Sequence, residues 1–295
     1  MISPDDRLDP DLIQANLRTK RIGRKVLVYE QTASTNDVAA EYGRNPDNDG
    51  LVVFAEEQTA GRGRSGAKWH SRRGDSLLFS FVLTSGDLGG ELLSLTCAVA
   101  VAEAVGQIGS CPARIKWPND IVLAGKKVAG ILVESKVQRK KDSLKCEVSS
   151  VKPSNLRLQT SNSPTPAVRP ASSVIHVTGV GINCHQTEED FPPELRETAT
   201  SLDLVSGARC HRATVARRVV TSLDHWLRIA ERDSKQVTET WSRLSTQLGQ
   251  RVTLSCNRKR FTGNCIGVDP EKGLILQLDR GGVRMFDAAH THIVK

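Results

Sequence analysis

Hydrophobic and polar positions along the chain first indicate strands mixed with helices, and later short strands alone. Apolar runs of roughly four to eight residues predict strands, and apolar positions three and four residues apart predict helices. Strands are expected at residues 26–29, 51–55, 77–83, 115–123, 128–134 and 174–182. Helices are expected near Asp9 and Pro10, which fit a cap and a first turn, and at 37–43, 91–108, 214–231 and 235–248.

Three of these helices carry clear burial patterns. Residues 91–108 are apolar nearly all round, which predicts a helix enclosed on every side. Helix 214–231 is expected to bury Val215, Val219, Trp226 and Ala230. Helix 235–248 is expected to bury Val237, Trp241, Leu244 and Leu248.

After residue 250 the period changes from helical to two. Short strands are expected at 251–254, 260–268, 273–278, 283–286 and 291–294. Short strands joined by Gly, Asp and Pro turns are typical of a small all-β barrel. The predicted fold is therefore α+β, a mixed sheet packed with helices, followed by a small C-terminal β-barrel. The expected domains are a helical extension at 1–25, a main domain at 26–248 and the barrel at 249–295.

Charge changes this picture in one segment. The 295 residues carry 41 Lys and Arg against 33 Asp and Glu, a net charge of +8. Residues 135–170 hold eight basic and two acidic side chains, so this segment supplies +6 of that total. Its prolines and serines predict a basic, flexible insert over 135–173 within the main domain. No helix-turn-helix or zinc-finger pattern is present, and residues 1–25 are too few for a DNA-binding domain, so no DNA partner is expected.

Composition excludes several further classes. The hydrophobic content of 38% and charged content of 25% fit an ordinary globular protein rather than a collagen, a coiled coil or a disordered chain. No stretch is expected to reach the roughly 18 apolar residues of a membrane span, and the polar N-terminus is unlike a secretory signal. The seven cysteines show no C-x-x-C spacing. We therefore expect free thiols in a reducing cytoplasm and no membrane partner.

The densest chemical feature is the segment of residues 58–69, Gln-Thr-Ala-Gly-Arg-Gly-Arg-Ser-Gly-Ala-Lys-Trp. Its glycines let the backbone approach a ligand, and Arg62 and Arg64 offer planar donors for phosphate or carboxylate. The spacing also satisfies the dinucleotide fingerprint G-x-G-x-x-G, but a Rossmann unit needs a helix to start there, and a strand follows instead. An anion-binding loop is favoured, with a solvated loop as the alternative.

Four other motifs have both a structural and a functional interpretation. Ser34-Thr35-Asn36 fits a helix cap or a helix N-terminus that faces a ligand. Lys116-Trp117-Pro118-Asn119-Asp120 fits a turn, and Lys127 before 128–134 fits a hairpin lysine in solvent or one held at the sheet end. Glycines in Gly179-Val180-Gly181-Ile182-Asn183 indicate close approach of a ligand or another backbone.

Together with Thr200-Ser201-Leu202, these motifs resemble the biotin–protein ligases, which attach biotin to carboxyl carriers, in that family's order and over roughly residues 20–295. The resemblance implies a fold like that of class II aminoacyl-tRNA synthetases and biotin ligases. It implies an ATP-dependent enzyme with Mg²⁺ that forms biotinyl-5′-AMP and then transfers biotin to a carrier lysine. The implied partners are biotin, ATP and the biotin carboxyl carrier protein of acetyl-CoA carboxylase or a related carboxylase. A cytoplasmic monomer or homodimer is expected.

The resemblance also implies a role for each matching residue. The implied biotin-binding residues are Ser34, Thr35, Asn36, Gln58, Arg62, Gly63, Arg64, Lys127 and Gly130. The implied ATP- or adenylate-binding residues are Gly61, Arg64, Trp69, Asn119, Asp120, Lys127 and Asn183. Lys127, Arg62 and Arg64 are the implied catalytic cations, and Asp120 is the implied magnesium ligand.

Two departures from the family keep alternatives open. The insert at 135–173 is longer than the loop by which the family usually joins these two core strands. The sequence also shows no pattern of the N-terminal DNA-binding domain that repressor-type members carry. A lipoate or octanoate ligase would share the fold, but we expect it to lack the double-arginine loop. A nucleic-acid-binding regulator would depend on the insert's charge, and an inactive biotin-binding module would need neither Lys127 nor both arginines.

Overall fold

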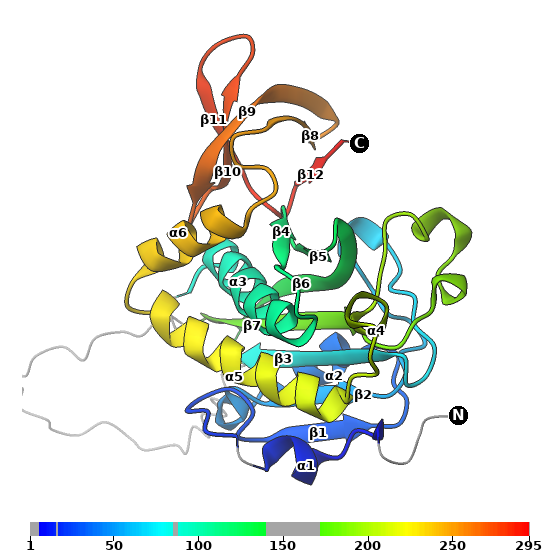
Figure 1. The fold of residues 1–295 in the computed structure, drawn as a ribbon. Helices are drawn as coiled ribbons and strands as arrows, with labels where there is room; N and C mark the ends of the chain where they lie inside the picture. The colour runs from blue at the N-terminus through cyan, green and yellow to red at the C-terminus, as the bar shows by residue number, and fades with distance from the viewer. Residues whose placement is uncertain (1–5, 16, 85–87, 140–171, 295) are drawn as a thin grey trace, which may run out of the picture.

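The computed structural model describes residues 6–15, 17–84, 88–139 and 172–294, and most of them surround a seven-stranded sheet (Figure 1). The strand order is β1-β2-β3-β7-β6-β5-β4. β1 and β2 are parallel and the other neighbours are antiparallel, so the predicted mixed sheet is confirmed. The strands are β1 (Val26–Tyr29), β2 (Val52–Ala55), β3 (Ser76–Leu83), β4 (Arg114–Lys116), β5 (Asp120–Leu123), β6 (Lys126–Arg139) and β7 (Ser172–Asn183).

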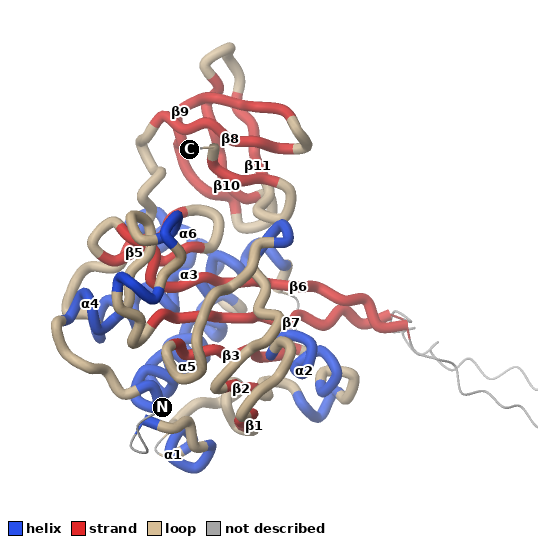
Figure 2. Tube along the Cα trace, turned by 90° about the vertical axis from the view of Figure 1, so that its right-hand side faces the viewer, coloured by secondary structure: helices blue, strands red, loops and turns tan. Residues whose placement is uncertain are grey.

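Helices cover both faces of this sheet (Figures 1 and 2). Val52 and Phe54 of β2 lie in the main core with α3 (Gly90–Ile108) and α5 (Arg212–Ala230). Val53 belongs to a separate small core under α2 (Thr35–Tyr42), because successive side chains of a strand point to opposite faces. The other helices are α1 (Pro10–Gln14), α4 (Leu202–Ser206), α6 (Ser234–Leu244) and the 3₁₀ turns η2 (Pro46–Asn48), η3 (Arg64–Gly66), η4 (Glu188–Asp190) and η5 (Pro193–Leu195).

α3 is long and apolar enough to cross a membrane by length and composition alone, so the expectation that no stretch reaches this size is wrong. Most of it is buried in the core, where it contacts α5, α6 and β6. Enclosure on nearly every side accounts for its composition, and the predicted buried helix is confirmed.

The four predicted inner residues of α5 are all buried, as are Val237 and Trp241 of α6. α6 nevertheless ends at Leu244, and Leu248 is 38% exposed, so the predicted extension to residue 248 is wrong. The reason is tertiary, because Ser245 bridges to Ile115 and the Thr246 N–H donates to the Ile115 carbonyl at 2.9 Å. The chain therefore leaves the helix to follow β4.

The expected single strand at 115–123 is two strands. Arg114 pairs with Val122 and Lys116 with Asp120, so β4 and β5 run antiparallel around the Trp117–Pro118 bond, which is cis. Pro118 has no N–H for a continued ladder, and the chain reverses at that point.

The insert begins later than predicted. β6 continues to Arg139 and β7 starts at Ser172, because their backbone ladder extends through Ser135–His176 to Arg139–Ser172. Residues 140–171 lie outside the described part of the chain, so the loop expected there stays a prediction.

A second sheet follows residue 250, with the order β11-β10-β9-β8-β12. Its strands are β8 (Arg251–Cys256), β9 (Lys259–Asp269), β10 (Gly273–Leu278), β11 (Val283–Phe286) and β12 (Thr291–Ile293). A closed barrel would need β11 to pair with β12, and the described residues show no such pair. The strand prediction is confirmed, but the sheet is open because the three-residue β12 pairs only with β8.

Candidate functional site

A pocket of about 320 Å³ lies where β6, β7, the 58–69 loop and β12 meet. It gathers residues from sequence positions as distant as Ser34 and Ile293. The predicted site residues on its lining are Ser34, Thr35, Asn36, Gln58, Arg62, Gly63, Arg64, Trp69, Asn119, Asp120, Lys127 and Gly130. The five motifs therefore converge on one cavity.

Two predicted residues lie behind this lining. Gly61 accepts a hydrogen bond from the Trp69 N–H at 3.1 Å, which closes the base of the loop. Asn183 is 5% exposed, and its side-chain amide donates to the Thr200 carbonyl at 2.9 Å. Direct contact of either residue with a nucleotide stays a prediction.

One end of the pocket is a polar network at the start of α2. Gln58 Oε1 accepts hydrogen bonds from the Thr35 N–H at 2.7 Å and the Thr35 hydroxyl at 3.0 Å. Ser80 Oγ lies 2.7 Å from Thr35 Oγ1 and 2.6 Å from Asn36 Oδ1, and sequence reasoning missed this serine because its strand appears uniformly buried. Ser34 makes no side-chain capping bond, so simple helix capping does not explain its hydroxyl.

The loop at 58–69 holds its two arginines in different surroundings. It is drawn tight by the Gly63 N–H, which donates to the Ala67 carbonyl at 2.6 Å, and by a left-handed Ser65 with φ 53°. Arg62 donates two bonds of 2.7 Å to Asp37, which raises the pKa of the guanidinium. Arg64 donates to the Thr291 carbonyl at 3.0 Å and approaches Asn119 Oδ1 at 3.5 Å, while burial lowers its pKa.

A flat floor under the loop depends on two glycines. A Cβ atom on Gly181 would lie 2.6 Å from the Trp69 ring, and one on Gly130 would lie 3.0 Å from it. Gly179 likewise leaves room for Asn36, whose Oδ1 would lie 2.3 Å from an added Cβ. Side chains, rather than the ligand or backbone expected from the sequence, therefore approach the β7 glycines. Trp69 packs beneath the loop, and its buried Nε1 has no hydrogen-bond partner.

Lys127 is the second residue of β6, and its side chain lines the pocket. Its backbone is fixed on both sides, because its N–H donates to the Thr198 carbonyl at 2.7 Å and its carbonyl accepts from Thr200 at 2.8 Å. Its Nζ lies 2.6 Å from Asp120 Oδ1 and 5.6 Å from the centre of the Trp69 ring. The side chain is 37% exposed, so an incoming anion can reach the ammonium group.

The C-terminal sheet supplies part of the pocket that sequence reasoning missed. His292 and Ile293 of β12 line it, although the His292 side chain is also exposed. Arg64 joins the two parts through its bond to Thr291, and the Ala288 N–H donates to Glu91 at the start of α3. No local signal marks β12 for this position, because the docking of one sheet beside the other determines it.

Comparison with known proteins agrees with the motifs. Residues 28–148 match the sequence profile described as the biotin/lipoate A/B protein ligase family. Over these residues the chain is similar to that family. A bifunctional ligase/repressor BirA of Bacillus subtilis is 28% identical over 98% of this chain and 80% of its own length.

Two further relatives extend the comparison. A biotin–[acetyl-CoA-carboxylase] ligase of Mycobacterium tuberculosis is 29% identical over 84% of this chain and 82% of its own length. The structure of a biotin protein ligase from Aquifex aeolicus in complex with biotin and ATP has a TM-score of 0.68 and 24% identity, covering 92% of this chain and 99% of its own. The chain therefore shares the fold of that structure over 92% of its length.

Proposed function

We propose that this chain is an ATP-dependent biotin–protein ligase. In the first step the biotin carboxylate attacks the α-phosphorus of ATP, which forms biotinyl-5′-AMP and releases pyrophosphate. In the second step a carrier lysine amine attacks the activated carbonyl, which forms an amide and releases AMP. The observation that carries this proposal is the convergence of the double-arginine loop, Lys127 and the polar network on one pocket.

The first step must bring two anions together. Unit charges about 4 Å apart repel by about 4 kcal/mol at an effective dielectric near 20. Lys127 on the pocket wall and Arg64 from the loop offer positive charge to both groups and to the charge that builds on phosphorus. Arg62, held by Asp37, contributes by orienting the loop.

The polar network favours biotin over lipoate. The ureido group of biotin donates and accepts hydrogen bonds, and Ser34, Thr35, Asn36 and Gln58 offer matching partners. A lipoyl dithiolane offers these polar groups no hydrogen-bond partner, and polar sites discriminate strongly against such analogues. This reasoning supports biotin, with lipoate or octanoate as the alternative substrate to test.

Magnesium fits the residues present. Asp120 is the one carboxylate among the described residues that line the pocket, and Mg²⁺ prefers one or two carboxylates together with substrate phosphates. We propose that Asp120 holds the ion, which would neutralise phosphate charge. Lys127, 2.6 Å from Asp120, would then turn towards the substrate carboxylate.

The carrier and the assembly are proposed in less detail. We propose that the substrate protein is the biotin carboxyl carrier of acetyl-CoA carboxylase or of a related carboxylase. We also propose that the ligase is a cytoplasmic monomer or homodimer. The Bacillus subtilis relative is named a repressor as well as a ligase. We retain the prediction that this chain does not bind operator DNA, and a gel-shift titration with biotinyl-5′-AMP present checks it.

One assay tests the proposed activity. The full chain is incubated with biotin, MgATP and a purified carrier domain, and biotin transfer is scored by streptavidin blot. A parallel reaction with lipoate in place of biotin is scored by the mass of the carrier. Biotin-dependent labelling that needs ATP supports the proposal. Labelling with lipoate alone, or ATP-independent labelling, would overturn it.

A further inference from the structure

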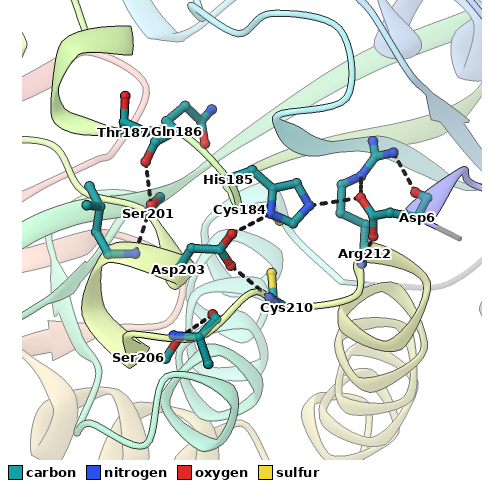
Figure 3. Close-up of polar contacts among 12 residues, drawn as sticks. Asp6, Cys184, His185, Gln186, Thr187, Ser201, Asp203, Ser206, Cys210 and Arg212 are labelled. Carbon is teal, nitrogen blue, oxygen red and sulfur yellow. Dashed lines mark hydrogen bonds and ion pairs between the residues drawn. The ribbon is translucent and has the colours of Figure 1, made fainter. Parts of the chain in front are cut away.

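A second cluster of chemically active side chains lies outside the pocket, just past the end of β7 (Figure 3). It consists of His185 after β7, Asp203 in α4 and Cys210 before α5. One nitrogen, one oxygen and the sulfur of these residues all lie within 4.8 Å of one another. A nitrogen, an oxygen and a sulfur ligand at this spacing suit a borderline-soft divalent cation such as Zn²⁺.

His185 is already oriented as a metal-binding histidine would be. Its Nε2 lies 2.8 Å from Asp6 Oδ2, and Arg212 Nε donates to the same oxygen at 2.8 Å. Its Nδ1 faces Asp203 Oδ2 at 2.7 Å. Metal-bound histidines characteristically donate their other ring N–H to a carboxylate, which fixes the ring and its tautomer.

Zinc binding at this cluster would be coupled to proton release. The ion binds a thiolate and an unprotonated imidazole nitrogen, so the Cys210 thiol proton and any proton on His185 Nδ1 would pass to solvent.

We propose that His185 Nδ1, an Asp203 carboxylate oxygen and Cys210 Sγ form a zinc-type site with a fourth position for water. Tetrahedral ligands at about 2.0–2.3 Å from the ion lie roughly 3.3–3.7 Å apart, so Asp203 must move away from His185. Its helix α4 has five residues and its side chain is 20% exposed. The Cys210 N–H donates to Asp203 Oδ1 at 2.8 Å, so the carboxylate would have to turn about this bond or exchange it for the ion. The ion would tie together the ends of β7, α4 and α5.

The test is zinc binding by the full chain without nucleotide, under a thiol-free reductant. Competition with a chromophoric chelator measures affinity, and Co²⁺ substitution reports a thiolate-to-metal absorption band. We expect one equivalent of Zn²⁺, a higher melting temperature with zinc, and at least about tenfold weaker binding in Cys210→Ser. Cys111→Ser, which removes a partly exposed thiol elsewhere, should bind as the parent does.

Asp203→Asn provides a second variant if Cys210→Ser fails to fold, and it should weaken zinc binding by a similar factor. Equal zinc affinity in the parent and the folded variants would overturn the proposal. So would a Co²⁺ complex without the thiolate band.

Discussion

Arg212 and Arg64 are both largely covered, but their hydrogen-bond partners differ. Arg212 is fully buried and is bound by Asp6 at 2.8 Å and Glu56 at 2.7 Å. Among the described residues Arg64 donates only to neutral oxygens, those of Thr291 and Asn119. A cation saturated by carboxylates holds the fold together, whereas one that faces neutral groups still attracts an anion. The partners of a buried cation therefore distinguish a structural group from a binding group.

The largest expected effect tests the structural side of this comparison. Arg212→Met leaves Asp6 and Glu56 without their cation, so we expect the free energy of unfolding to fall by about 3–5 kcal/mol. Urea denaturation measures the loss. The control is Arg251→Ala, which breaks an exposed pair with Asp279 and should change the free energy of unfolding far less. Equal losses in both variants would contradict the distinction.

Lys127→Ala tests a cation that we propose binds the substrate. We expect adenylation to slow by about 10²–10³-fold, the usual effect of losing one oriented electrostatic group, with little change in unfolding free energy. Pyrophosphate release in the presence of biotin and MgATP measures the rate. Lys126→Ala is the matched control, since the Lys126 ammonium donates to the Arg196 carbonyl at 3.1 Å at the surface and does not line the pocket as the structure describes it. A near-parent rate for Lys127→Ala would rule out its assigned role.

Gly181→Ala tests the close contact between β7 and the Trp69 ring at the floor of the pocket. The added Cβ would lie 2.6 Å from Trp69, so we expect a loss of about 1–3 kcal/mol together with weaker biotin binding. Calorimetric titration with biotin measures the affinity. Removing the ring in Gly181→Ala/Trp69→Leu should recover part of the unfolding free energy. Gly267→Ala in β9, where an added Cβ would make an ordinary contact of 3.8 Å with Ile275, should leave biotin binding unchanged.

Arg64→Gly should let the adenylate escape about ten times faster, because a charged hydrogen-bond donor over the phosphate is lost. Free biotinyl-5′-AMP in a rapid filtrate reports the escape. Arg62→Gly should release less of it, since Asp37 already occupies that guanidinium. If Arg64→Gly retains biotinyl-5′-AMP as well as the parent protein does, Arg64 does not hold the adenylate in the pocket.

The smallest effect appears at low pH. Burial alone would raise the pKa of Asp6, but hydrogen bonds with His185 and Arg212 outweigh it and lower the value from 3.8 to about 2. The stability from this carboxylate is therefore present above pH 3.8 and is lost as the pH falls towards 2. Unfolding free energy measured across this range should decline less steeply in Asp6→Asn. Identical slopes would contradict the assignment.

Local features of this fold were predictable from the sequence. Asp9 caps α1 by accepting hydrogen bonds from the N–H groups of Asp11 and Leu12, as its position before Pro10 predicted. The all-round apolar pattern of α3 predicted its burial correctly, and neighbours in sequence determine both of these outcomes. Twelve of the fourteen predicted site residues line the pocket because the family resemblance, rather than a local pattern, marked the motifs that the fold brings together.

Contacts between distant segments were not predictable in the same way. The end of α6 depends on a contact with Ile115, and the open edge of the second sheet depends on the pairing of β12 with β8. Gly181 of β7 is needed because the Trp69 ring packs against it. The cluster at His185 likewise joins Asp6, Asp203 and Cys210, which no spacing connects. Such contacts are determined only when the whole chain packs.

The span of the pocket lining, from Ser34 to Ile293, also has a consequence during synthesis. A nascent chain emerging from the ribosome displays its polar network and both arginines well before β12 is translated. Until residue 293 has left the exit tunnel, the cavity lacks the wall that β12 supplies. Ribosome-bound chains should therefore be inert as ligases, and premature stops before β12 should yield proteins that bind the vitamin poorly and trap no activated product.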